Sequence, residues 1–317
     1  MRELKEKKFL FILVFALPVA AALILLVYYF TIAKQRTATS ADFSSRSTTQ
    51  SSIEKKNELI SFTIASGMDY SDWSKQDFPY VEPLKVDNYP DLTEEEKGYF
   101  ETHKVMLTRG RLACQNPRKI MDAMGLKKGD IVAEVGCGTG FFTFQLAKRV
   151  GKSGKVYALD TNSMAIKYVK VQKDRIRREM GVNFENIEFI QNETTDLLLP
   201  PGSIDIAFLC DIHLIARPSG PPEYYAAKED RNPLKDKKLV YKIIKDENRE
   251  LMENIRQTLK PGGKLVIIDE NTEGPLKSNN LLSPGEVRKY LEEFGFEFLE
   301  SPDVIAKQHF FLIMRKK

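Results

Sequence analysis

A glycine-rich turn between a strand-like segment and a helix-like segment is the feature that most restricts the fold of this chain. Residues 130–135 (DIVAEV) are mostly apolar and short enough for a buried strand, and residues 141–150 have helical spacing. Between them lie three glycines, at positions 136, 138 and 140. Glycines at such a turn let the backbone approach a ligand at the carboxyl end of a parallel sheet. The segment therefore predicts an α/β fold that binds a ligand at this turn.

Short apolar runs bounded by Gly, Pro or polar residues recur along the chain and are separated by helix-length segments. This alternation predicts a mostly parallel sheet with helices on both faces. Helix starts are expected near residues 91–94, at Asn116-Pro117 and at the capping box Ser283–Glu286. Seven strands are expected, at residues 130–135, 155–159, 187–190, 204–209, 264–268, 296–299 and 309–314.

Residues 9–33 form an uncharged, strongly apolar run. At about 1.5 Å per residue, a helix of this length exceeds the roughly 30 Å hydrocarbon core of a bilayer. The run predicts one N-terminal transmembrane helix after a short basic terminus at residues 1–8. A cleavable signal peptide is the alternative, because Thr39-Ser40-Ala41 resembles a cleavage site. Since the apolar part of signal peptides spans only about 7 to 15 residues, we favour an uncleaved anchor.

The charges near the apolar run do not decide on which side of the membrane the rest of the chain lies, because four basic residues precede the run and three follow it. Residues 40–52 are rich in Ser and Thr, which is typical of a flexible tether. We expect a tether and N-terminal extension over residues 34–97 and the main domain over residues 98–317. The basic residues that precede the run are Arg2, Lys5, Lys7 and Lys8, and those that follow it are Lys34, Arg36 and Arg46.

Composition excludes several classes of partner and site. The chain has 48 Lys and Arg against 44 Asp and Glu, and it has no long basic block, so a nucleic-acid partner is not expected. Its three cysteines, Cys114, Cys137 and Cys210, are far apart and form no C-x-x-C pair. Neither a metal site nor a disulfide framework is therefore predicted. The oligomeric state is not indicated.

The spacing of the glycines separates two classes of cofactor. A dinucleotide fingerprint needs G-x-G-x-x-G, but Phe141 stands where the third glycine would fall. Asp160 ends a predicted strand twenty residues after Gly140, where its carboxylate can accept hydrogen bonds from both ribose hydroxyls. An acidic residue at this position suits an adenosine that has no 2′-phosphate.

Four motifs in order resemble those of the class I S-adenosylmethionine-dependent methyltransferases, and most closely the UbiE/menaquinone-type branch. The resemblance covers nearly everything from about residue 112 to the C-terminus. It implies a Rossmann-like, seven-stranded, mostly parallel sheet and S-adenosylmethionine as the cofactor. The motifs are IVAEVGCGTGFFT at residues 131–143, VYALD at 156–160, residues 187–215, and LKPGGKLVIID at 259–269.

The resemblance also implies which residues hold the cofactor. Glu134 and the three glycines would line its methionine part, Asp160 would hold the ribose, and Glu193 with Thr194 would lie at the adenine edge. Glu193 replaces the aspartate that is commoner in the family. Cys137 is expected to be a small loop residue, because no basic residue nearby in the sequence favours a thiolate. The full predicted set is Glu134, Gly136, Cys137, Gly138, Gly140, Asp160, Thr161, Glu193 and Thr194.

The predicted catalytic residues follow the fourth strand. Asp211 and His213 are expected at its carboxyl end, where the resemblance places the acceptor. A histidine titrates near neutral pH and suits a general base for a hydroxyl or phenol, although a packing or helix-capping role for His213 is an equal alternative. The N-P-P-Y motif of planar-nitrogen methylation is absent, which argues against nucleobase or amide acceptors. His103 and His309 are expected to be surface or packing residues.

Residues of about 216–246 form an insertion that a compact member of the family would lack. It is too long for a simple strand-to-helix connection, so we expect a lid, with a solvated insertion as the alternative. Arg217, Tyr224 and Tyr225 would close over the acceptor, and the lysines of residues 235–245 would contact anionic headgroups.

Together these features predict a membrane-anchored, single-pass methyltransferase that acts on a small-molecule or lipid-like acceptor. An NAD-dependent oxidoreductase is a weaker alternative, because Phe141 breaks the dinucleotide fingerprint. A tethered S-adenosylmethionine-binding module without catalysis is the third hypothesis.

Overall fold

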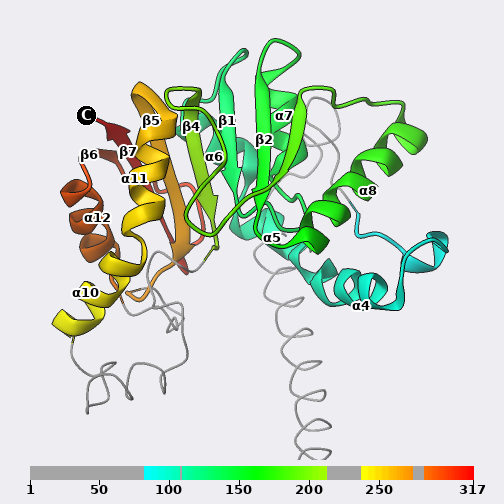
Figure 1. The fold of residues 1–317 in the computed structure, drawn as a ribbon, viewed down its shortest axis with the longest axis horizontal. Helices are drawn as coiled ribbons and strands as arrows, with labels where there is room; N and C mark the ends of the chain where they lie inside the picture. Colours follow the sequence, from blue (N-terminus) through cyan, green and yellow to red (C-terminus); the bar gives the residue numbers. More distant parts are fainter. Residues whose placement is uncertain (1–81, 108, 213–236, 274–281) are drawn as a thin grey trace, which may run out of the picture. The chain divides into compact units, whose positions relative to one another are not determined.

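The computed structural model describes residues 82–107, 109–212, 237–273 and 282–317 (Figure 1). All of them belong to one compact unit, Gly67–Lys317. The predicted anchor at residues 9–33 and the tether that follows it lie outside the described residues. No helix in the described ranges is both long and apolar enough to cross a membrane.

The fold is built on one seven-stranded sheet with the strand order β3-β2-β1-β4-β5-β7-β6. Strands β1 to β5 pair in parallel, and β7 runs antiparallel to both β5 and β6. The predicted seven-stranded, mostly parallel sheet is therefore confirmed. The strands are β1 (Ile131–Val135), β2 (Lys155–Asp160), β3 (Ile187–Gln191), β4 (Ile204–Cys210), β5 (Leu259–Glu270), β6 (Phe296–Glu300) and β7 (His309–Lys316).

Helices cover both faces of the sheet, as predicted (Figure 1). Successive strand residues point to opposite faces, so Val132 belongs to one buried apolar cluster and Ala133 to the other. Apolar residues of α6 (Pro117–Ala123), α7 (Thr143–Val150) and α8 (Ser163–Met180) fill the first cluster. Those of α10 (Lys237–Glu247), α11 (Arg249–Thr258) and α12 (Pro284–Glu293) fill the second.

The predicted helix starts are confirmed by their caps. The Asn116 side chain accepts a hydrogen bond from the Lys119 N–H, and Pro117 occupies the first turn of α6. Capping boxes open α12 at Ser283 and α4 (Glu94–His103) at Thr93. These local bonds satisfy backbone donors that have no partner within the helix.

Strand β5 begins at Leu259, earlier than the predicted residue 264. Leu259 pairs with Ile204, and Lys264 pairs with Ile206. The intervening residues of the Pro-Gly-Gly segment therefore form a bulge in the strand. A side chain at Gly263 would bring its Cβ to 2.9 Å from the Lys260 carbonyl oxygen. The bulge thus requires a glycine at this position.

In the structure the N-terminal extension continues past the predicted residue 97 to Cys114, and its residues 82–103 pack on α8. Its described part contains η3 (Val86–Asn88), α4, η4 (Lys104–Leu107) and α5 (Arg109–Cys114). The Phe100 ring meets the Tyr168 ring edge-on, with 4.7 Å between centroids. The Tyr168 hydroxyl accepts a hydrogen bond from the Leu84 N–H at 3.2 Å. The predicted domain boundary at residue 98 therefore falls within α4, which shares a core with α8.

The C-terminal part of the predicted lid is helix α10. Its Val240 and Ile244 side chains are buried, and Lys245 forms an ion pair with Glu293 of α12. This part of the insertion is packed into the fold, and the contact of its lysines with anionic headgroups stays a prediction. Arg217, Tyr224 and Tyr225 lie outside the described residues.

Truncating Phe100 tests how firmly the extension is attached. Phe100 is 1% exposed, so Phe100→Ala should lower the free energy of unfolding by about 3 to 5 kcal/mol through lost burial and a new cavity. Urea denaturation measures this change. The control, Val105→Ala, alters a side chain that is 51% exposed and should change stability by less than about 0.5 kcal/mol. Equal effects of the two substitutions would contradict a shared core.

Candidate functional site

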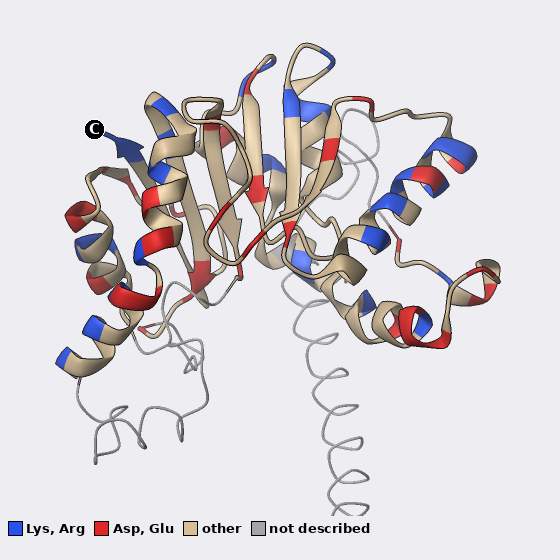
Figure 2. Ribbon diagram, in the orientation of Figure 1, with Lys and Arg blue, Asp and Glu red and all other residues tan. Residues whose placement is uncertain are grey.

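A cavity of about 550 Å³ lies at the carboxyl ends of the central strands. Its lining includes residues from the ends of β1, β2 and β4 and from the loops that follow them. Strand order reverses between β1 and β4, and open α/β sheets bind ligands at such a switch point. Figure 2 shows acidic residues at the carboxyl ends of β2 and β5. The fold therefore places a ligand-sized, partly acidic cavity where the sequence predicted one.

The glycine loop after β1 is held against the end of β2. The Leu159 carbonyl oxygen accepts hydrogen bonds from the N–H groups of Gly136 and Cys137, both at 2.8 Å. Gly136 has a φ of +76°, and a Cβ at this position would lie 2.6 Å from Ile212 Cγ2. Gly136, Cys137 and Gly138 line the cavity. Gly140 does not, because it packs against Val169 of α8.

Asp160 holds the same loop through its side chain. One carboxylate oxygen accepts a hydrogen bond from the Gly138 N–H and the other from the Asn162 N–H, both at 2.9 Å. Each oxygen keeps a lone pair for a further donor. The carboxylate therefore lines the cavity in a fixed orientation, beside Thr161.

Glu134 supplies a second, buried carboxyl group. It is 4% exposed, lines the cavity, and accepts a hydrogen bond from the Thr143 hydroxyl. Burial raises the pKa of Glu134 to about 8, although the Thr143 hydrogen bond and the Arg111 charge oppose the increase. The group is accordingly protonated in most molecules at pH 7.

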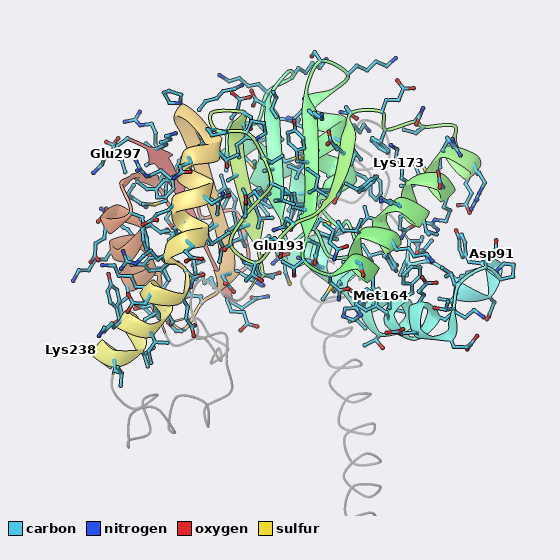
Figure 3. The ribbon with its side chains drawn as sticks, viewed as in Figure 1. Asp91, Met164, Lys173, Glu193, Lys238 and Glu297 are labelled. Atoms are coloured by element: carbon cyan, nitrogen blue, oxygen red, sulfur yellow. The ribbon has the colours of Figure 1, made fainter. Side chains whose placement is uncertain are left out.

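The loop after β3 contributes Asn192 and Thr194 to the cavity but not Glu193. The Asn192 side-chain amide donates to the Glu193 carbonyl oxygen, while its own buried Oδ1 has no partner among the described residues. Figure 3 places Glu193 at the carboxyl edge of the sheet. Asn192, the neighbour of the predicted adenine-edge residue, thus lines the cavity in place of Glu193.

Asp211, directly after β4, lies at another wall of the cavity. One carboxylate oxygen accepts hydrogen bonds from Arg111 at 3.1 Å and Gln115 at 2.7 Å. Its other oxygen lies 3.5 Å from Nε2 of His309. The guanidinium of Arg111 also lies over the Phe141 ring, 4.5 Å from its centroid. The second predicted catalytic residue, His213, lies outside the described residues, so its role stays a prediction.

Two histidines that were predicted to be surface or packing residues, His103 and His309, are among the residues that line the cavity. His309 begins β7 and faces Asp211, because β7 runs beside β5 with its first residue at the carboxyl end of that strand. His103 stacks on Tyr99, with 3.8 Å between ring centroids. Burial and the nearby Asp160 charge raise the pKa of Tyr99 to about 12, so its hydroxyl stays protonated.

The sequence analysis also missed three other cavity residues from the extension, Tyr99, Met106 and Arg111. Tyr99 and His103 are four residues apart and therefore share one face of α4. This spacing was the only feature of the sequence that indicated a shared position for Tyr99 and His103. The part of the chain that the structure describes has no cluster of three or more His, Cys, Asp or Glu side chains that fits a metal ion.

Comparisons with known proteins agree with this architecture. A family model described as "Methyltransferase domain" matches residues 126–295, which is more than half of the chain. The crystal structure of an S-adenosylmethionine-dependent methyltransferase from Aquifex aeolicus is similar in fold, with a TM-score of 0.51 and 23% identity; the match covers 71% of this chain and 100% of that one.

Two curated relatives match over shorter segments. The demethylmenaquinone methyltransferase of Staphylococcus carnosus is 32% identical over 106 residues, which are 33% of this chain and 36% of that protein. The ubiquinone/menaquinone biosynthesis C-methyltransferase UbiE of Hydrogenovibrio crunogenus is 26% identical over 152 residues, which are 48% and 46%. The chain thus matches less than half of the length of each.

Alanine at Gly136 tests whether the loop needs a glycine there. Gly136→Ala combines a strained φ with the contact to Ile212, so it should lower the free energy of unfolding by about 2 to 5 kcal/mol. The control is Gly202→Ala, where φ is +65° but no atom lies within 4 Å of the added Cβ. It should cost only about 1 to 2 kcal/mol. Urea denaturation compares the two, and equal losses would rule out the close contact at Gly136.

Proposed function

The chain belongs to the methyltransferase-domain family, with S-adenosylmethionine as its cofactor, and from this premise we propose that it is a membrane-anchored methyltransferase for a small or lipid-like acceptor. The observation that carries the proposal is the cavity at the β1/β4 switch point, where the glycine loop and two acidic side chains meet. Because the curated relatives match only part of their length, activity and acceptor are both proposals.

The residues that line the cavity fit this cofactor. Its volume of about 550 Å³ lies within the usual range of about 300 to 1,000 Å³ for small-molecule sites. S-adenosylmethionine carries a sulfonium and an ammonium group, both of which favour nearby acids such as Glu134. Its ribose hydroxyls need acceptors, which Asp160 provides.

We assign the cofactor's parts along the glycine loop. Glu134, Gly136, Cys137 and Gly138 would surround the methionine part, and Asp160 would bind the ribose. Thr161, Asn192 and Thr194 would lie toward the adenine. Gly140 and Glu193 would act indirectly, since Gly140 packs the loop on α8 and the Glu193 N–H bonds to the Asp196 carbonyl oxygen.

The bound cofactor would supply a methyl group on a positively charged sulfur, which is already activated for transfer. The chain's own contribution is then to exclude water and to align the acceptor. Phe141, Phe142, Phe208 and Ile212 form an apolar part of the cavity wall that suits both tasks.

The acceptor class is proposed from the cavity wall and from the N-terminal segment. Aromatic and aliphatic side chains favour an apolar acceptor, and the relatives' names point to quinone-type molecules. The apolar run at residues 9–33 would hold the domain beside the bilayer, in which such acceptors dissolve. We therefore propose a single-pass membrane protein with a quinone-like or similar lipid acceptor.

Calorimetric titration of the full chain in detergent micelles tests the cofactor site. We expect S-adenosylmethionine and S-adenosylhomocysteine to bind and NADH not to bind. Asp160→Ala removes charge-assisted hydrogen bonds of about 1.5 to 3 kcal/mol, so both affinities should fall about 10- to 100-fold. Asp91→Ala is the control, because Asp91 is exposed, does not line the cavity, and lies far from Glu193 in Figure 3. Binding of NADH alone would overturn the proposal.

Proton release on cofactor binding tests the role of Glu134. Its raised pKa of about 8 leaves it mostly protonated at pH 7, whereas a neighbouring cation favours the carboxylate. Binding should therefore release about one proton, and affinity should rise with pH until about pH 8 and then level off. Titrations in buffers of different ionisation enthalpy measure the released protons. Glu134→Gln should abolish the release, and the idea fails if this variant releases as many protons as the natural chain.

A further inference from the structure

Two exposed apolar side chains, Val105 and Met106, lie next to each other in η4. They are 51% and 40% exposed. Within the described ranges only two other large apolar side chains are exposed, Met180 and Leu198. Single exposed apolar residues are common on protein surfaces, but two neighbours beside a ligand cavity need a specific explanation.

The segment η4 is fixed in position by its neighbours. Leu107 is 1% exposed and belongs to the first apolar cluster of the fold. The Arg111 guanidinium donates a hydrogen bond to the Met106 carbonyl oxygen at 3.2 Å and forms an ion pair with Asp211. The fold therefore determines that Val105 and Met106 are exposed while Leu107 is buried.

Met106 connects the exposed pair to the cavity. It lines the cavity together with Tyr99, His103 and Arg111 of the same extension. Its Sδ would lie 3.7 Å from a Cβ at Gly138, so its side chain lies over the glycine loop. Because Met106 is also exposed, it stands at the mouth of the cavity. Val105 and Met106 together thus form an apolar rim at this mouth.

The apolar rim has little charge beside it that would attract an anionic surface. Lys104 precedes Val105 and forms an ion pair with Glu101 of α4. The first turn of α4 contains three glutamates. Insertion of the two apolar side chains among lipids therefore suits this segment better than attraction to anionic headgroups. A contact of this kind is insensitive to salt.

The length of the preceding chain favours a bilayer as the partner of the apolar rim. The predicted anchor ends at residue 33, and the described part of the extension begins at Glu82. Even when fully extended, the residues between them span at most about 170 Å, so an anchored chain would keep η4 within this distance of the bilayer. Such confinement raises the effective concentration of the two surfaces. A contact of two side chains can then form although it would be too weak for a free domain.

We propose that Val105 and Met106 insert into the interface of the bilayer, so that the mouth of the cavity opens toward the lipid. A lipid-like acceptor would then enter the cavity from the bilayer without crossing water. This inference rests on the proposed function and deepens it, because it assigns the surface through which the acceptor reaches the site.

Tryptophan fluorescence in vesicles tests the contact. Trp73→Phe first removes the single natural tryptophan, and Val105→Trp or Met180→Trp then adds one probe. The full chain is reconstituted in phosphatidylcholine vesicles with or without bromine on the acyl chains, because bromine quenches a tryptophan that it contacts. We expect the probe at position 105 to lose most of its fluorescence in the brominated vesicles, at low and at high salt. The probe at position 180 should keep its fluorescence.

Met180 is a matched control for this experiment. It is 45% exposed, so a tryptophan there has similar access to an interface and the same preference for it. Helix α8 begins just after the carboxyl end of β2, and its 18 residues rise about 27 Å toward the opposite edge of the sheet, where Met180 ends the helix. Equal quenching at both positions, or none at position 105, would overturn the proposal.

Methyl transfer to two acceptors tests the entry route. One is demethylmenaquinol dissolved in the vesicles, and the other is a water-soluble naphthohydroquinone without the lipid tail. Val105→Asp places a charge in the apolar rim, so kcat/KM for the vesicle-bound acceptor should fall about tenfold. The value for the soluble acceptor should not change, because Val105 does not line the cavity. Met180→Asp should alter neither value, and an equal loss for both acceptors in Val105→Asp would contradict entry from the bilayer.

The outcomes separate this inference from the proposed function. A natural chain that does not float with vesicles would overturn the membrane anchor, and one that does not bind S-adenosylhomocysteine would overturn the cofactor site. Turnover of neither acceptor would overturn the quinone-like acceptor, while the quenching still decides the contact. Flotation and cofactor binding without selective quenching at position 105 would overturn only the contact of the apolar rim. Unchanged affinity of Val105→Asp for S-adenosylhomocysteine guards against a loss of activity through misfolding.

Discussion

The end of β2 holds the glycine loop in place through hydrogen bonds. Two successive residues, Leu159 and Asp160, accept hydrogen bonds from the N–H groups of Gly136, Cys137 and Gly138. Strand β1 lies between β2 and β4, so the loop that follows β1 is held at the switch point of the sheet, where Gly136, Cys137 and Gly138 line the cavity. These hydrogen bonds fix the loop conformation within the fold.

Asp211 provides a second fixed point, at the opposite side of the cavity. Its carboxylate contacts Arg111 and Gln115 at the end of α5 and faces His309 at the start of β7. One side chain thereby connects the N-terminal extension, the central sheet and the last strand. The extension consequently forms part of the cavity wall, to which it contributes Tyr99 and Arg111.

The sequence predicts the parts of this structure that depend on local signals. Apolar runs located the strands, and Asn116, Thr93 and Ser283 marked helix starts because each cap is formed by neighbouring residues. The site residues that were missed meet their partners across long stretches of chain: Arg111 contacts Asp211, and His309 comes from the antiparallel last strand. A local sequence pattern cannot indicate such contacts, because the order of the strands in the sheet determines them.

Burial shifts the pKa values of an acid and a base at the two sides of the cavity in opposite directions. At the glycine loop, it raises the pKa of Glu134 to about 8 and so favours a neutral acid. At the end of β7, it lowers the pKa of His309 and so favours a neutral base. Neutral side chains at these two positions avoid the cost of burying two charges. A cation bound beside Glu134 would favour the charged form of that acid. The attraction between the two charges would then offset the cost of burying the carboxylate.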